Sequence, residues 1–294
     1  MTCTLCPRQC AVSRHDQQHM GFCQTTQTAT VTRAAPHMWE EPCISGTNGS
    51  GAVFFAGCNL GCIYCQNAQI SRNGQVGQAV TPQELRQIFL QLKDQGVHNI
   101  NLVTPTHLSH VIGQALATPI GLPVVYNCGG YESICALRSL EGKIQIYLPD
   151  LKYVDPDLAK AYSSAPDYPT HAKQAILEMY RQVGNCQFDQ QGLLQKGVLI
   201  RHMILPGHTK NTLAVIDWVA NTFPKDGVLF SLMSQYTPMP AVAGHKPLGR
   251  KVTQREFEKC RDALFDSGIE NGFIQEPTSA NSCFIPPFDL TNEP

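Results

Sequence analysis

Charged residues are scarce in this chain of 294 residues, at 15% against about 25% in an average soluble domain. Lys and Arg together number 22 and Asp and Glu 23, so the chain lacks the net positive charge that attracts nucleic acid or anionic lipid. It also lacks an apolar run of about 18 residues and an N-terminal cationic stretch before an apolar core. We therefore expect neither a nucleic-acid partner nor a membrane span, and we expect a cytoplasmic location.

Cysteine, in contrast, is abundant, with 13 residues, an odd number. In a reducing compartment, clustered cysteines bind metals or act as thiols before they form disulfides. Seven of the thirteen fall into two groups, one near residue 60 and one before residue 24. We assign no role to the other six, which are Cys43, Cys128, Cys135, Cys186, Cys260 and Cys283.

Apolar runs of strand type alternate with helical patterns along the chain. A helix is predicted to begin at Thr81 with a capping box and to end at Gly96, and the last helix runs from the capping box at Thr253 to Gly268. Further helices are predicted over about 107–118, 131–140, 171–183 and around 213–218. The strands are predicted over 51–57, 98–104, 123–127, 144–148, 197–205 and 228–233.

This alternation predicts an α/β fold with parallel βαβ units. Eight strands would close a full barrel, so six favour a partial (β/α)6 TIM-like barrel with its chemistry at the carboxyl ends of the strands. We divide the chain into a cysteine-rich N-terminal extension (1–48), the barrel (49–275) and an extended C-terminal tail (276–294).

The most specific motif follows the first predicted strand and reads Cys58-x3-Cys62-x2-Cys65, with Tyr64 before the last cysteine. Three thiolates are too few to close a tetrahedral zinc site or a four-cysteine iron–sulfur site. They can hold three irons of a [4Fe-4S] cube and leave the fourth iron open. The alternatives are a zinc-stabilised loop that borrows Cys43 or His37 as a fourth ligand, and a ferredoxin-like electron carrier.

This stretch resembles the cluster motif of the radical S-adenosylmethionine (SAM) superfamily. The resemblance implies that Cys58, Cys62 and Cys65 bind a [4Fe-4S] cluster and that Tyr64 lies against the adenine of SAM. It also implies reductive cleavage of SAM to a 5′-deoxyadenosyl radical, which abstracts a hydrogen atom from the substrate. We assign no catalytic acid or base, because abstraction by a carbon radical does not require one.

Within the superfamily, the chain resembles the pyruvate formate-lyase activating enzyme branch that carries an N-terminal four-cysteine motif. The resemblance implies an oxygen-sensitive activase, a glycyl-radical enzyme as partner substrate, and a reductant of flavodoxin or ferredoxin type. The alternative substrates are a peptide, another macromolecule or a small metabolite. The resemblance rests on Cys3-x-x-Cys6-Pro7-Arg8, His37-x-Trp39-Glu40-Glu41-Pro42, Gly49-Ser50-Gly51, Val103-Thr104-Pro105-Thr106-His107, Asp150-Leu151-Lys152 and Gln235-Tyr236.

Polar residues at two predicted strand ends are candidates for binding the cofactor. Asp150 and Lys152 resemble the family's Asp-x-Lys motif, in which Lys152 would neutralise the methionine carboxylate and Asp150 would bind a monovalent cation or a polar group. Arg201 would hold the cofactor or the barrel edge. His202 is its neighbour on the opposite strand face, so at most one of the two points into the barrel.

Three further strand ends supply candidates by the same resemblance. Thr104 and Thr106 stand where the activating enzymes carry Gly-Gly-Glu, so hydroxyls and carbonyls replace the family's carboxylate. Asn127 matches an Asp-Thr segment that faces the ribose or a cation. Gln235 or Tyr236 stands where the family places a histidine near the ribose.

The N-terminal group, Cys3-x2-Cys6-x3-Cys10-x12-Cys23, supplies four thiolates, enough to saturate one metal centre. Zinc sites usually pair two C-x-x-C knuckles and only one is present, which favours a second [4Fe-4S] cluster over Zn. A third interpretation is four free thiols. For Glu40 and Glu41 in the following turn, contact with substrate and a solvated turn beside a packed Trp39 are both open.

Overall fold

The computed structural model describes residues 3–15, 20–276 and 288, and its centre is one largely parallel sheet. The strands pair in the order β10-β9-β8-β6-β5-β4-β2-β1-β3, and a short β7 pairs with β8. The strands β2, β4, β5, β6, β8, β9 and β10 are parallel to their neighbours in this series, whereas β1, β3 and β7 are antiparallel additions. Their bounds are β1 Ala29–His37, β2 Ser50–Phe55, β3 Gln78–Val80, β4 Ile100–Val103, β5 Val124–Cys128, β6 Ile146–Pro149, β7 Gln187–Phe188, β8 Leu194–Met203, β9 Leu229–Met233 and β10 Gly272–Gln275.

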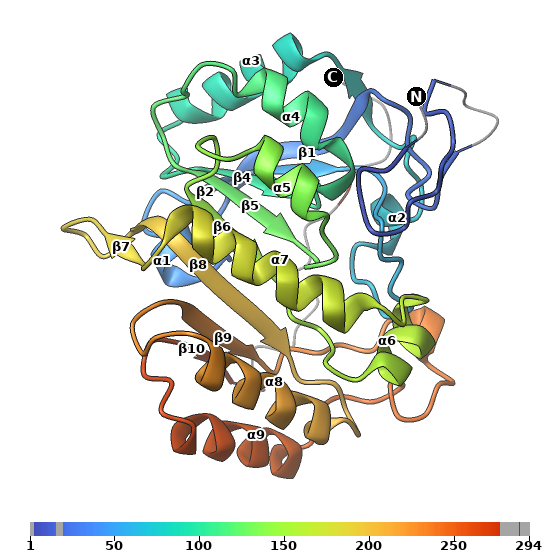
Figure 1. The fold of residues 1–294 in the computed structure, drawn as a ribbon, viewed down its shortest axis with the longest axis vertical. Helices are drawn as coiled ribbons and strands as arrows, with labels where there is room; N and C mark the ends of the chain where they lie inside the picture. The colour runs from blue at the N-terminus through green and yellow to red at the C-terminus, as the bar shows by residue number, and fades with distance from the viewer. Residues whose placement is uncertain (1–2, 16–19, 277–287, 289–294) are drawn as a thin grey trace.

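The larger helices cover the outer face of this curved sheet (Figure 1). The N-terminal segment and α2 lie on the side toward which the arrows of β5 and β8 point, that is, near the carboxyl ends of the strands (Figure 1). The helices are α1 Pro42–Ser45, α2 Ala68–Ser71, α3 Pro82–Asp94, α4 Ser109–Ala115, α5 Ile134–Ser139, α6 Pro156–Ser163, α7 Tyr168–Val183, α8 Thr209–Thr222 and α9 Gln254–Asp266, with short 3-10 turns at Thr106–Leu108 and Pro240–Val242.

Local sequence signals set the ends of the best-defined helices. Thr81 and Glu84 form both hydrogen bonds of a capping box at the start of α3, and Thr253 and Glu256 do the same for α9. Reciprocal caps satisfy backbone N–H groups that would otherwise lack partners in the first turn. Both predicted capping boxes are confirmed.

The inner face of the sheet is filled at one level by α1, the short helix between β1 and β2. Cys43 and Ile44 of α1 are buried against apolar side chains of β5, β6, β8 and β9. Figure 1 shows α1 near β7, on the side opposite to the ends of the strand arrows. The segment before α1 therefore enters the sheet's concave side, and it brings Glu40 and Glu41 with it.

The six predicted strands are confirmed as β2, β4, β5, β6, β8 and β9, and the mixed α/β, partial TIM-like fold is confirmed with them. β10 adds a seventh parallel strand that the sequence reasoning missed, and α6 was missed as well. β1 joins the expected N-terminal extension directly to β2, so residues 29–37 belong to the main sheet. Of the predicted tail, the described residues are 276 and 288. In the described part of the chain, no helix is long and apolar enough to cross a membrane.

Candidate active site at the carboxyl ends of the strands

A cavity of about 710 Å³ opens where the parallel strands end. Its volume lies in the range of about 300–1,000 Å³ that small-molecule and cofactor sites occupy. The cysteine triplet contributes one wall, and residues of β4, β5, β8 and the segment before α1 contribute others. The predicted site residues that line it are Cys58, Cys62, Tyr64, Cys65, Thr104, Asn127, Asp150, Lys152, Arg201 and Gln235.

The three cysteines of the triplet carry hydrogen bonds suited to metal-bound sulfur. The backbone N–H of Leu60 donates to Cys58 Sγ over 3.3 Å, and the Ser163 hydroxyl donates to Cys62 Sγ over 3.0 Å. Cys65 Sγ lies 3.4 Å from the Ser71 hydroxyl. Hydrogen bonds of this kind tune iron–sulfur clusters. The donor set, its access to the cavity and these bonds therefore fit a cluster held by three thiolates.

Without metal, burial favours the protonated thiol at Cys58 and Cys62. Burial raises the pKa of Cys58 to about 12, and neighbouring Cys62 and Cys65 reinforce the shift. Burial also raises the pKa of Cys62, while the positive charge of Lys152 acts in the opposite direction. Because metals bind thiolates, loading this site releases protons and is favoured by higher pH.

Tyr64 belongs to a buried chain of hydroxyl groups that ends on a cysteine. Its hydroxyl lies 2.6 Å from that of Tyr153, which in turn lies 2.9 Å from the Ser163 hydroxyl. Ser163 then donates to Cys62 Sγ. Tyr64 lines the cavity, but only 4% of its surface is exposed, because its ring packs edge-on against two neighbouring tyrosines. These contacts and the bonded hydroxyl fix Tyr64 in place.

Asp150, Lys152 and Arg201 form a charged network on the cavity wall. Lys152 Nζ is 2.6 Å from Asp150 Oδ2, and Arg201 Nε is 3.0 Å from Asp150 Oδ1. Burial opposes ionisation of Asp150, but the two cations outweigh it and hold its pKa below the usual value. Both carboxylate oxygens thus accept from cations of the chain, and the monovalent cation expected beside Asp150 stays a prediction.

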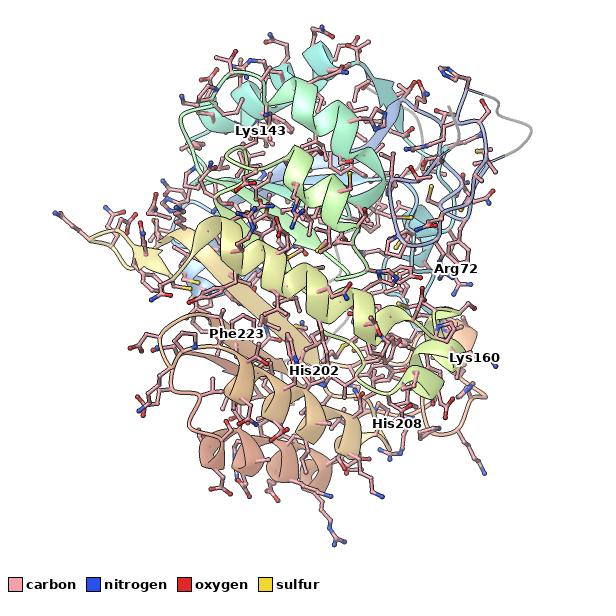
Figure 2. All side chains as sticks on the ribbon, viewed as in Figure 1. Arg72, Lys143, Lys160, His202, His208 and Phe223 are labelled. Carbon is pink, nitrogen blue, oxygen red and sulfur yellow. The ribbon has the colours of Figure 1, made fainter. Side chains whose placement is uncertain are left out.

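Arg201 and its neighbour on β8 point to opposite sides, as predicted from strand geometry. Arg201 lines the cavity. His202 is buried on the outer side, where its ring nitrogens lie 2.6 Å from the Leu151 carbonyl and 3.0 Å from the Thr212 hydroxyl of α8 (Figure 2). His202 is therefore part of the packing between β8 and α8.

Glu40 is the site residue that the sequence analysis left undecided. It accepts from Asn101 Nδ2 at 3.3 Å, Asn127 Nδ2 at 3.1 Å and Arg201 Nη1 at 3.1 Å, so one carboxylate joins β4, β5 and β8. The interpretation as a solvated turn beside a packed tryptophan is wrong, because Glu40 is mostly buried while Trp39 is 63% exposed at the cavity rim. In the sequence, the only local sign of this role was the pair of acidic residues before Pro42.

Glu41, the next residue, is buried, and it does not line the cavity. Burial raises its pKa to about 7, against the opposing charge of Arg201. Glu40 therefore joins Asp150 as a carboxylate of the network, whereas Glu41 lies outside the cavity with a raised pKa.

Thr104 and Thr106 follow β4 but occupy different places. Thr104 lines the cavity and has a φ of +62°, a left-handed conformation that is strained for a β-branched residue and concentrates at functional sites. Thr106 is buried away from the cavity and donates to Glu132 Oε1 over 2.6 Å. The structure thus brings only Thr104 of this pair to the cavity.

Gln235 and Tyr236 after β9 are separated in the same way. Gln235 lines the cavity beside Met233. Tyr236 is buried, packs edge-on against Tyr64 and donates to the Leu248 carbonyl over 2.8 Å. Tyr236 therefore supports the tyrosine of the triplet from behind.

The four N-terminal cysteines surround a second cavity of about 10 Å³, roughly the space of one water molecule. Cys6 and Cys23 are buried, and burial raises the pKa of Cys6 to about 12 with a further contribution from Cys23. Across residues 3–15, 20–276 and 288, no three His, Cys, Asp or Glu side chains are grouped to hold one metal ion. For the triplet this is compatible with a cube, because cube thiolates bind different irons.

Comparison with known proteins identifies the family. The family model of the radical SAM superfamily matches residues 52–219, more than half of the chain. The chain belongs to this superfamily. Among curated proteins it is 25% identical over 270 residues to the uncharacterized protein MJ0674 of Methanocaldococcus jannaschii, covering 88% of this chain and 72% of that protein.

The solved structure of SuiB shows the same fold at low sequence identity. SuiB of Streptococcus suis superposes with a TM-score of 0.50 and 14% identity over 75% of this chain, which spans about half (47%) of the SuiB chain. A domain of a pyruvate-formate lyase-activating enzyme from Bacteroides vulgatus gives a TM-score of 0.36 at 14% identity, covering 66% of this chain and 91% of that domain. Identities this low speak for the fold alone.

Proposed function

We propose that this radical SAM enzyme holds its [4Fe-4S] cluster at Cys58, Cys62 and Cys65 and uses SAM to abstract hydrogen from a glycine of a partner enzyme. When bound, cluster and SAM supply a one-electron cleavage that yields methionine and a 5′-deoxyadenosyl radical. The observation that carries the proposal is the placement of all three triplet cysteines on a cavity with charged groups at the strand ends.

The charged network suits the carboxylate end of an amino acid. Lys152 and Arg201 can receive the methionine carboxylate, while Asp150 and Glu40 keep these cations oriented. Charge-assisted hydrogen bonds of this type are short and strong, and the partly buried wall limits competition from water. Gln235 can donate to a ribose, and Tyr64 can contact the adenine from the cavity wall.

A protein substrate is supported by the apolar rim of the cavity. Met38 is 45% exposed and Trp39 is 63% exposed, and both line the cavity. Exposed aromatic and methionine side chains beside a site are enriched where proteins dock. The site would admit a glycine-bearing loop after reduction of the cluster by a flavodoxin or ferredoxin type protein.

A smaller substrate, such as a metabolite or short peptide, is favoured by one contact. Phe288 packs edge-on against Phe54 at a centroid distance of 5.4 Å, and Phe54 lines the cavity. A C-terminal residue at this wall narrows the space for a large partner. An activase would require Phe288 to move so that the partner can enter, whereas an enzyme for a small substrate would not.

For the N-terminal lobe, defined as residues 3–15 and 20–27, we propose a second metal centre held by Cys3, Cys6, Cys10 and Cys23. All four cysteines face one small cavity. Iron would make the lobe an electron relay, whereas zinc would only stabilise its fold. Counting iron and zinc in the protein and in C3A/C6A distinguishes the two.

The decisive experiment is anaerobic reconstitution followed by incubation with SAM and dithionite. Formation of 5′-deoxyadenosine is expected, and its absence from protein that holds a cube would refute the enzyme function. Electron spin resonance then tests for a glycyl radical on candidate partner enzymes. A glycyl radical without added small substrate supports the activase, and turnover of a metabolite alone supports the second function.

A further inference from the structure

Arg8, in the N-terminal lobe, donates to four backbone carbonyl groups at once. The acceptors are Asn59 at 2.9 Å, Leu60 at 3.2 Å, Ser163 at 2.8 Å and Ser164 at 2.5 Å. The planar guanidinium group presents its donors in a fixed fork, and the single ammonium group of lysine cannot reproduce this geometry.

Aromatic rings hold the guanidinium in this position. Its carbon lies 3.8 Å from the centre of the Phe22 ring and 5.3 Å from that of Tyr131. Stacking against aromatic faces stabilises a cation and restricts its rotamers. Arg8 is therefore a fixed group of the structure.

The carbonyl groups that accept from Arg8 lie in two segments. One segment carries Cys62, and the other donates a hydrogen bond to its sulfur. Asn59 and Leu60 lie between Cys58 and Cys62 in the triplet loop. Ser163 and Ser164 end α6, and the Ser163 hydroxyl donates to Cys62 Sγ over 3.0 Å. Arg8 thus fixes both the loop that carries the sulfur and the residue that donates to it.

The lobe also fits the triplet loop closely at two glycines. A Cβ on Gly57 would lie 2.4 Å from the Cys23 carbonyl oxygen, and a Cβ on Gly61 would lie 3.0 Å from the Phe22 ring. Both glycines also have a positive φ. The contact between the lobe and the loop leaves no room for side chains at these positions.

We propose that Arg8 is a positioning residue for the radical cluster: by fixing the triplet loop and Ser163, it holds the Ser163 hydroxyl on the sulfur of Cys62 and so sets the cluster's reduction potential. A hydrogen bond to sulfur favours the more negative, reduced cluster. Loss of the bond makes the cluster harder to reduce. This inference rests on the proposed cluster at the triplet but on neither its substrate nor the metal of the lobe.

The test is a redox titration of the reconstituted cluster without SAM, followed by electron spin resonance, in R8Q, S163A and R8Q/S163A. We expect each single variant to lower the reduction equilibrium constant about tenfold, which corresponds to about 59 mV for one electron. The double variant should show no further decrease, because both changes remove the same bond. C3A/C6A provides a background with only the triplet cluster if the lobe carries iron.

R86Q is the matched control, because Arg86 also donates to several backbone carbonyl groups. Its acceptors belong to Ala115, Thr118 and Pro119, none of which lies in the triplet loop. Its cluster should titrate as in the unchanged protein. If R8Q does not fold, R8K replaces it and should shift the potential in the same direction, since lysine cannot span four acceptors.

An unchanged potential in the arginine variant, or additive shifts in the double variant, would overturn the proposal. A cube that titrates as expected but yields no 5′-deoxyadenosine would refute the proposed function and leave the role of Arg8 standing. Absence of any cube at the triplet would refute both.

Discussion

The two cysteine groups differ in what surrounds them. The triplet lines a cavity of about 710 Å³ with two cations and two carboxylates at its wall, whereas the four N-terminal cysteines surround about 10 Å³ of space. The open space beside the three thiolates has room for a ligand, whereas the small pocket between the four thiolates has none. The comparison teaches that the same residue type can build a reactive site or a closed one, according to what the fold places next to it.

The largest expected effect comes from removing the triplet itself. C62A should reduce 5′-deoxyadenosine formation to the level of the metal-free protein, because the two thiolates that remain are too few to anchor the cube. C3A/C6A is the comparison variant and should retain the triplet cluster's signal in electron spin resonance. If both variants lost that signal equally, the distinction between the two cysteine groups would fail.

The next largest effect is expected at the charged network. In D150N, Lys152 loses its carboxylate partner while Arg201 keeps Glu40, and a mostly buried charge without its partner costs about 3 kcal/mol of unfolding free energy. Denaturant unfolding measures this loss, with D94N at an exposed position of α3 as control. Equal stability of the two variants would mean that the network is solvated.

The buried carboxyl of Glu132 should make stability depend on pH. Its buried carboxyl accepts from Thr106 and Tyr126, and burial raises its pKa to about 7 from an ordinary 4.5. The folded state thus binds this proton more tightly, so its stabilising contribution is full below about pH 4.5 and is lost as pH rises through 7.

E132Q should remove this dependence, which amounts to about 3 kcal/mol between pH 5 and 8. Melting temperatures of the wild-type protein and of E132Q, measured across that range, give the comparison. E276Q, at an exposed carboxylate, should follow the wild-type curve. Parallel curves for E132Q and wild type would show that Glu132 titrates normally.

The smallest effect is expected at the rim of the open cavity. W39A should weaken binding of a protein partner by about 2 kcal/mol, the cost of truncating a tryptophan at the centre of an interface. Formation of 5′-deoxyadenosine without partner should not change. F265A removes an equally exposed aromatic residue from α9 and serves as control. An unchanged partner affinity in W39A would favour the small-substrate function.

Much of the fold follows from local sequence patterns. The capping boxes at Thr81 and Thr253 were predicted because a cap joins residues three apart. The six central strands were predicted because both of their faces are buried and apolar. β1 and β10 were missed, since only the first three residues of β1 are buried and β10 is short and only partly buried. The assignment of α5 to 131–140 was too long, because Tyr131 and Glu132 precede the helix.

The sequence by itself determined the cysteine triplet, its place after the first parallel strand and hence the superfamily, because ligand spacing within one loop is a local property. The tertiary structure alone decided which polar residues meet there. Glu40 and Arg201 are 161 residues apart, and Arg8 reaches Asn59 from 51 residues away. Such pairs are set by the curvature of the whole sheet and by the packing of the N-terminal lobe, which no local pattern encodes. For the same reason, the sequence placed Thr104 beside Thr106 and Gln235 beside Tyr236, and only the fold separated one of each pair from the cavity.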